Sequence, residues 1–168
     1  QWRMVRKWTR KACLLLPPVP ENFFLQPGEK PFKWPLKVTF LGVLHPDKGI
    51  KEVIELFMRL RGNPRFECSI HAMYNPRAPA QVKLHKWLLR QQAIKYVPME
   101  QHKWSVELER QVQAVLAETD IFVQPFKTLQ NTVDTPLLLL EAMASLCAVL
   151  TTPIGSIPKI YGKESRFL

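Results

Sequence analysis

Apolar residues change their spacing in a regular way along most of the chain. Five short runs, rich in β-branched and aromatic residues, are each typical of a buried strand. The runs are Lys37–Val43, Phe66–Met73, Ala93–Val97, Ile121–Pro125 and Ala148–Thr152. Such nearly continuous apolar strands indicate a parallel sheet that is covered on both faces.

Segments with apolar residues at helical spacing lie between these runs. The predicted helices are Gly49–Leu60, a segment through Trp87–Leu89, Glu107–Ala117 and Pro136–Leu146. The alternation predicts an α/β fold, a Rossmann-like parallel sheet with helices on both faces. Ligands of such sheets bind at the carboxyl ends of the strands. Three loops should therefore lie near a binding site: Val43–Gly49, Pro125–Thr135 and Thr152–Pro158.

The first 33 residues follow a different pattern. Gln1–Ala12 has basic residues on one face of a predicted helix and apolar residues on the other. This helix either binds a membrane surface or nucleic acid, or packs on a further domain. Pro17–Lys33 is rich in proline, glycine and charge, as connecting loops are. The predicted division is a helix and linker over 1–33, entering from another domain, and the sheet unit over 34–168.

Composition excludes several classes of protein. Of 168 residues, 46% are apolar and 23% charged, which excludes general disorder. The longest nearly apolar run, Pro136–Leu150, is too short to span a bilayer. Three widely spaced cysteines and four histidines without an i,i+4 pair indicate neither a disulfide framework nor a metal site. This cysteine usage favours a reducing compartment, and we expect a cytoplasmic location.

The formal net charge of +10 concerns partners and not the fold. Nucleic acid, an anionic membrane surface and phosphate-bearing small molecules would all suit it. No RNA-binding or helix-turn-helix signature is present, and the aromatic residues are not interleaved with basic ones along a strand. We therefore expect no nucleic acid partner.

Two loops carry candidate chemistry. In Gly42–Gly49 a lysine, Lys48, stands directly before a predicted helix, where backbone N–H groups and an ammonium group can bind phosphate. A solvated lysine at such a place is also ordinary. Asp134 or Thr135 could cap the next helix, with Pro136 at its first position.

Glu141 lies inside that apolar helix. An unpaired buried carboxylate would cost several kcal/mol. It must therefore face a ligand's hydroxyl groups, a basic partner, or solvent.

Three segments together resemble a known family. They are KVTFLGVLHPDKG at 37–49, DIFVQP at 120–125 and PLLLLEAMA at 136–144. They are similar to the nucleotide-sugar-binding C-terminal domain of retaining GT-B glycosyltransferases of the group 1, mannosyltransferase-like family. Weaker likeness at Leu15–Phe24 and Thr152–Ile160 extends the resemblance over Leu14–Leu168. It implies a truncated fragment, incomplete at its C-terminus, whose N-terminal acceptor domain is missing.

The resemblance also implies roles for individual residues. Lys48 would bind the donor diphosphate, and Glu141 the ribose. The family's arginine in the first loop is replaced by Val43, and Lys127 or Lys159 could supply the missing cation. The glutamate beside the transferred sugar would fall at Val133, next to Asp134. The donor's base would lie near 97–99, and Leu146 replaces a helix-ending glycine.

The implied reaction transfers a hexosyl unit, mannosyl or glucosyl, from a nucleoside-diphosphate sugar with retention of configuration. The predicted catalytic residues are Lys48, Glu141 and Asp134. The predicted donor-binding residues are Gly42, Val43, Lys48, Val97, Pro98, Met99, Thr135 and Glu141. No metal or other cofactor is implied, and an anionic membrane surface or a lipid-linked acceptor fits the charge. The alternatives are a catalytically degenerate binding module of the same fold and a basic nucleic-acid-binding domain.

Overall fold

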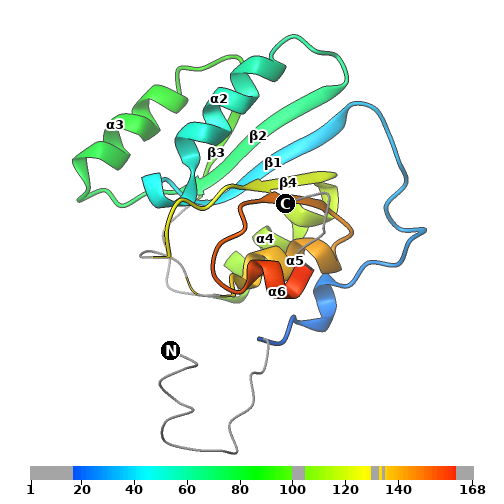
Figure 1. Ribbon diagram of the computed structural model, residues 1–168. Helices are drawn as coiled ribbons and strands as arrows, with labels where there is room; N and C mark the ends of the chain where they lie inside the picture. The colour runs from blue at the N-terminus through cyan, green and yellow to red at the C-terminus, as the bar shows by residue number, and fades with distance from the viewer. Residues whose placement is uncertain (1–16, 100–104, 130–132, 134, 162–168) are drawn as a thin grey trace, which may run out of the picture.

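A five-stranded, all-parallel sheet forms the centre of the chain (Figure 1). The computed structural model describes residues 17–99, 105–129, 133 and 135–161. The strands are β1 (Leu36–Val43), β2 (Phe66–Met73), β3 (Lys95–Pro98), β4 (Ile121–Gln124) and β5 (Ala148–Thr151). Their order across the sheet is β3-β2-β1-β4-β5. The predicted Rossmann-like α/β fold is therefore confirmed.

Helices cover both faces of the sheet (Figure 1). On one face lie α2 (Ile50–Leu60) and α3 (Pro79–Leu88), and on the other α4 (Val106–Glu118), α5 (Leu137–Ala144) and α6 (Ile157–Tyr161). Two short 3-10 turns, η1 (Glu21–Phe23) and η2 (Pro46–Lys48), lie in the loops. Each face has its own apolar core, centred on Phe57 and Leu88 under α2 and α3, and on Leu116 and Leu139 under α4 and α5. Within the described residues, no helix has the length and apolar character to cross a membrane.

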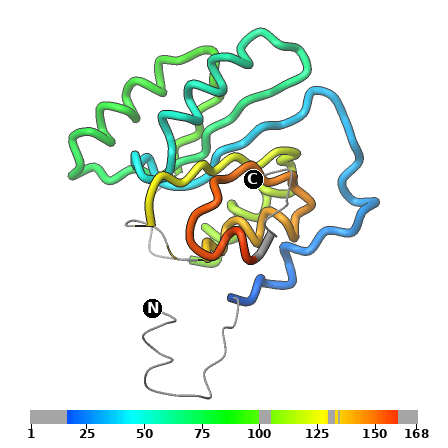
Figure 2. The backbone as a smooth tube through the Cα atoms, viewed as in Figure 1, coloured from blue at the N-terminus to red at the C-terminus, as the bar shows by residue number. Residues whose placement is uncertain are grey.

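The segment over residues 17–33 runs along the outside of the sheet unit and contacts it at a few residues, although most of its residues are exposed (Figure 2). Phe23 is fully buried in the core under α4 and α5. The Ser145 hydroxyl donates a hydrogen bond to the Phe23 carbonyl at 3.1 Å. The Lys30 ammonium donates to the carbonyls of Ser145 and Leu116, at 2.7 and 3.2 Å. The predicted helix at Gln1–Ala12 lies outside the described residues.

Helix α5 begins later and ends earlier than predicted. Pro136 is the N-cap and not the first helical residue, so the prediction that Asp134 or Thr135 caps this helix was wrong. At the other end Leu146 adopts a left-handed conformation with φ 56°. The Cys147 N–H then bonds back to the Ala142 carbonyl at 2.9 Å, which closes the helix. Leu146 therefore occupies the backbone conformation that a glycine provides without strain.

Candidate functional site at the carboxyl ends of β1 and β4

The loops that follow β1 and β4 meet at the carboxyl edge of the sheet. The connections from β1 and β4 lead to helices on opposite faces, which makes this the switch point where open α/β sheets bind ligands. Gly49, in a left-handed conformation with φ 72°, lies so close to Pro125 that a Cβ would be 2.0 Å from the Pro125 carbonyl oxygen. The Lys127 N–H also donates to the Asp47 carbonyl at 2.9 Å. Two of the three predicted loops are thus in direct contact.

Lys48 brings a positive charge to this contact. It ends η2, and its ammonium nitrogen lies 5.1 Å from the centre of the Phe126 ring. Burial lowers the pKa of Lys48, and the neighbouring Asp47 carboxylate opposes that shift in part. Helix α2 begins directly afterwards, and its N-cap, Gly49, has no side chain to satisfy the first-turn N–H groups. The ammonium group and the helix N-terminus together create a positive potential that suits an anion.

A second cation of this edge forms an ion pair with a carboxylate. The Lys127 ammonium lies 2.5 Å from Oε1 of Glu52 on α2, and this hydrogen bond raises the pKa of Lys127. Lys127 therefore lies in the loop after β4, beside the loop of Lys48, but its ammonium group is paired with Glu52. Lys159 lies in α6 and is exposed.

Glu141 is a buried carboxyl group without an ion pair to any basic residue of the described ranges. Its side chain projects from the middle of α5, is only 3% exposed, and has one oxygen, Oε1, without a hydrogen-bond partner. Burial raises the pKa of Glu141 to about 7, with a smaller contribution from the charge of Glu109. Among the residues that the structure describes, no lysine or arginine forms an ion pair with it. The two ordinary alternatives, a basic partner or solvent exposure, are thereby excluded for this part of the chain.

Gln124 is a buried polar residue that the sequence analysis did not single out. It ends β4 and is 3% exposed, and its Oε1 atom has no hydrogen-bond partner. Its Nε2 atom donates to the Leu41 carbonyl at 3.3 Å. A Cβ on Gly42 would lie 3.2 Å from the same nitrogen, so Gly42 gives this amide its space. The signal in the sequence was a single amide in the otherwise apolar run IFVQP.

Comparison with known proteins assigns the chain to a family. The sequence profile described as "Glycosyl transferases group 1" matches residues 35–168. The chain is a group 1 glycosyltransferase domain. No curated protein sequence matches. Among solved structures, the C-terminal domain of a glycosyl transferase group 1 family protein (LpcC) from Francisella tularensis is similar, with 23% identity and a TM-score of 0.49. That match covers 74% of this chain, and the chain spans 62% of the length of the matched one.

The other predicted site residues of this glycosyltransferase domain are placed as follows. Val43 ends β1 next to the contact of the two loops, and Thr135 is half-buried directly before α5. Val97 and Pro98 lie in β3, which β2 separates from β1. Met99 is buried in the core, and its N–H donates to the Ala72 carbonyl, so its backbone donor is already used. Asp134 lies outside the described residues.

Lys48 and Glu141 do not touch each other in the described part of the chain. Phe126 connects them: Lys48 lies over its ring, and the ring packs in the same core as Ala142, the residue after Glu141. Phe126 therefore contacts Lys48 and belongs to the core that α5, the helix of Glu141, helps to form.

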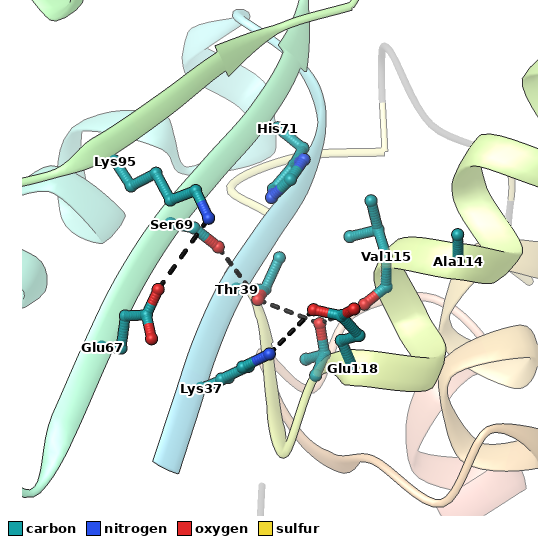
Figure 3. Close-up of a pocket in the computed structure, with 10 residues that line it drawn as sticks. Lys37, Thr39, Glu67, Ser69, His71, Lys95, Ala114, Val115 and Glu118 are labelled. Carbon is teal, nitrogen blue, oxygen red and sulfur yellow. Dashed lines mark hydrogen bonds and ion pairs between the residues drawn. The ribbon is translucent and has the colours of Figure 1, made fainter. Parts of the chain in front are cut away.

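A separate hollow of about 220 Å³ lies between the sheet and α4 (Figure 3). Ion pairs flank it, Lys37 with Glu118 at 2.7 Å and Lys95 with Glu67 at 3.9 Å. Its lining includes Thr39, which shares a hydrogen bond with Ser69 at 3.1 Å. It opens at the start of the strands, away from the loops described above, and most of its polar groups are already paired. Across the described residues, no group of three or more His, Cys, Asp or Glu side chains could hold a metal ion.

Proposed function

We propose that this domain binds the nucleoside-diphosphate sugar of a glycosyltransferase that transfers a hexosyl unit, mannosyl or glucosyl, with retention of configuration. The observation that carries the proposal is the buried carboxyl group of Glu141, whose Oε1 atom has no hydrogen-bond partner, on the helix that follows β4. Family membership supports sugar transfer in general.

Glu141 is suited to bind the ribose of the donor. A buried acceptor without a donor costs free energy, which a ligand hydroxyl can recover. Two vicinal hydroxyl groups match the two oxygens of one carboxylate. The pKa of about 7 means that the group is poised to ionise, and hydroxyl donors favour the ionised form. Gln124 offers a second unused acceptor, Oε1, on the same strand edge.

Lys48 and the N-terminus of α2 are suited to bind the diphosphate. The ammonium nitrogen of Lys48 lies directly before the first turn of α2, whose N-cap residue, Gly49, has no side chain to cap the N–H groups. With Val43 in place of the family's arginine, one charge-assisted interaction of roughly 1.5–3 kcal/mol is absent. During transfer, negative charge develops on the leaving diphosphate, and these groups would stabilise it electrostatically. By the resemblance, Asp134 would be the carboxylate beside the sugar, and backbone groups near Val97 and Pro98 would contact the base. No metal ion or other cofactor is needed for this scheme.

The test is calorimetric titration of the chain with UDP-, GDP- and ADP-sugars and with the free nucleotides. We expect selective binding for one base, and a loss of about tenfold or more in Glu141→Ala. Glu55→Gln removes an exposed carboxylate on α2 and serves as the matched control. If Glu141→Ala and the control bind alike, the ribose role is wrong.

The alternative is a degenerate module that keeps the fold but not catalysis. Val43 and Val133 favour it, because each replaces a charged residue of the family pattern, and Val133 is 63% exposed with no acidic group of its own. Glycosyl transfer by the full-length protein, together with its acceptor-binding domain, would exclude this alternative. Donor binding without turnover in that protein would support it.

A further inference from the structure

The exposed face of α3 carries three cations and an aromatic residue. Lys83 and Lys86 are exposed on the helix, and Arg90 follows two residues beyond its end. Their spacing of i, i+3 and i+7 places them on one face. Trp87, 40% exposed, lies beside this stripe. Helix α3 is an outer element of the fold, remote from α4, α5 and α6 (Figure 1).

An apolar groove of about 280 Å³ runs along the same helix. Leu84 and Trp87 of α3 form one wall, and Leu44, Pro46 and Ile50 form the other. The charged residues that line it, Lys51 and Lys83, are both basic. The groove therefore combines an apolar floor with a positive rim.

The surrounding sequence has a strongly one-sided charge. Between Glu67 and Glu100 there is no acidic residue, while five basic residues occur: Arg77, Lys83, Lys86, Arg90 and Lys95. The acidic side chains of α2 are Glu52, which Lys127 holds, and Glu55, one turn beyond Lys51. The face of α3 is thus complementary to an anionic surface.

We propose that this face of α3 docks on an anionic lipid bilayer, with Trp87 and the groove taking up apolar contacts at the level of the headgroups. Tryptophan beside lysine and arginine on one helix face is the arrangement that suits a membrane interface. Each basic residue near an anionic bilayer adds to the attraction, and salt weakens it. The groove borders the first turn of α2 at Ile50 and Lys51, but the basic residues and Trp87 of α3 that the proposal relies on are not among those assigned to the donor.

Co-sedimentation of the whole chain with vesicles tests the proposal. The vesicles contain phosphatidylcholine with or without phosphatidylglycerol. We expect binding only to the anionic vesicles, and a loss of at least tenfold in Lys83→Glu/Lys86→Glu. The matched control is Lys33→Glu/Arg61→Glu, which changes the net charge equally at exposed positions outside α3 and the groove. The basic segment 1–12 is present in every variant, so its contribution is constant.

A second variant tests the apolar contact. Trp87→Ser keeps every charge and removes a ring that is 40% exposed, and we expect it to weaken binding to anionic vesicles severalfold. Its thermal unfolding shows that the variant is folded under the conditions of the binding experiment. Equal losses in the two double variants would overturn the proposal, since net charge alone would then explain binding. Absence of binding to anionic vesicles would also overturn it. An acidic protein surface would then be the next partner to test against this face of α3.

Discussion

The backbone of Gly49 lies against the carbonyl group of Pro125, so close that a single methyl group would not fit between them. This contact joins the loop after β1 to the loop after β4. It also fixes the position of the α2 N-terminus relative to Phe126, and so shapes the candidate diphosphate site.

Gly49→Ala should therefore destabilise the fold more than an ordinary glycine substitution. Gly62 has a similar φ of 77° but open space around its Cα, which makes Gly62→Ala the matched control. We expect the control to cost about 1 kcal/mol from the left-handed backbone. Gly49→Ala should cost about 3 kcal/mol or more, because the Pro125 backbone must also move. Urea unfolding measures both values, and equal costs would mean that the two loops are not in contact.

Leu146→Gly should stabilise the protein. Leu146 adopts φ 56° at the end of α5, which a leucine side chain disfavours and glycine does not. The side chain is 41% exposed, so the packing that is lost offsets only part of this relief, and we expect a net gain of up to about 1 kcal/mol in the free energy of unfolding. Leu150→Gly, at an exposed position in β5, should instead destabilise the protein. A loss of stability in Leu146→Gly would contradict the left-handed assignment.

Glu141 should make stability depend on pH. Its pKa rises from the ordinary 4.5 to about 7 on folding, so the folded chain binds this proton more tightly than the unfolded chain. The contribution is complete below pH 4.5 and is lost as pH rises through about 7. It amounts to roughly 3 kcal/mol. Glu141→Gln lacks it, so the variant should gain stability relative to the unchanged chain between pH 5 and pH 8.

Urea unfolding of both proteins at the two pH values measures this difference. Because other groups titrate alike in both chains, their effects cancel in the comparison. Parallel pH profiles would show that the Glu141 carboxyl is hydrated in the folded state.

The two lysines of the site should differ in their effect on donor affinity. Lys48→Met removes a cation that no described carboxylate holds in an ion pair, and we expect a ten- to hundredfold loss, corresponding to roughly 1.5–3 kcal/mol. Lys127→Met should have a smaller effect, because Lys127 and its partner Glu52 are 53% and 40% exposed, where solvent screens their charges. Titration with a nucleoside-diphosphate sugar measures both. The reverse ranking would move the diphosphate site to the β4 loop.

Most of the fold was predictable because strands and helices are encoded by local periodicity. The run Phe66–Met73 matches β2 at both ends, and Gly49–Leu60 matches α2 within one residue. The predicted end of α5 was two residues too late because the helix ends at the left-handed backbone of Leu146, a conformation that leucine rarely adopts. The candidate site was only partly predictable. Lys127 binds Glu52, 75 positions away in the chain, and no local pattern reveals such a partner.

Gln124 also shows that the sequence alone does not reveal the partners of a polar side chain. A polar residue at the end of an apolar strand was visible in the sequence, but its unused oxygen follows from the neighbours that the fold brings to it. Glu141 was recognised because a carboxylate within an apolar helix is conspicuous without any knowledge of its neighbours.

The position of β4 next to β1 has a kinetic consequence. Lys37 and Asp120, which join these strands at their starts, are 83 positions apart, and the whole β2–β3 half lies between them. Closing so long a segment is slow compared with forming the neighbouring β1–β2 pair. The two halves of the proposed donor site should therefore meet late in folding. A bound nucleotide sugar that bridges them should leave the refolding rate unchanged and slow only the unfolding rate.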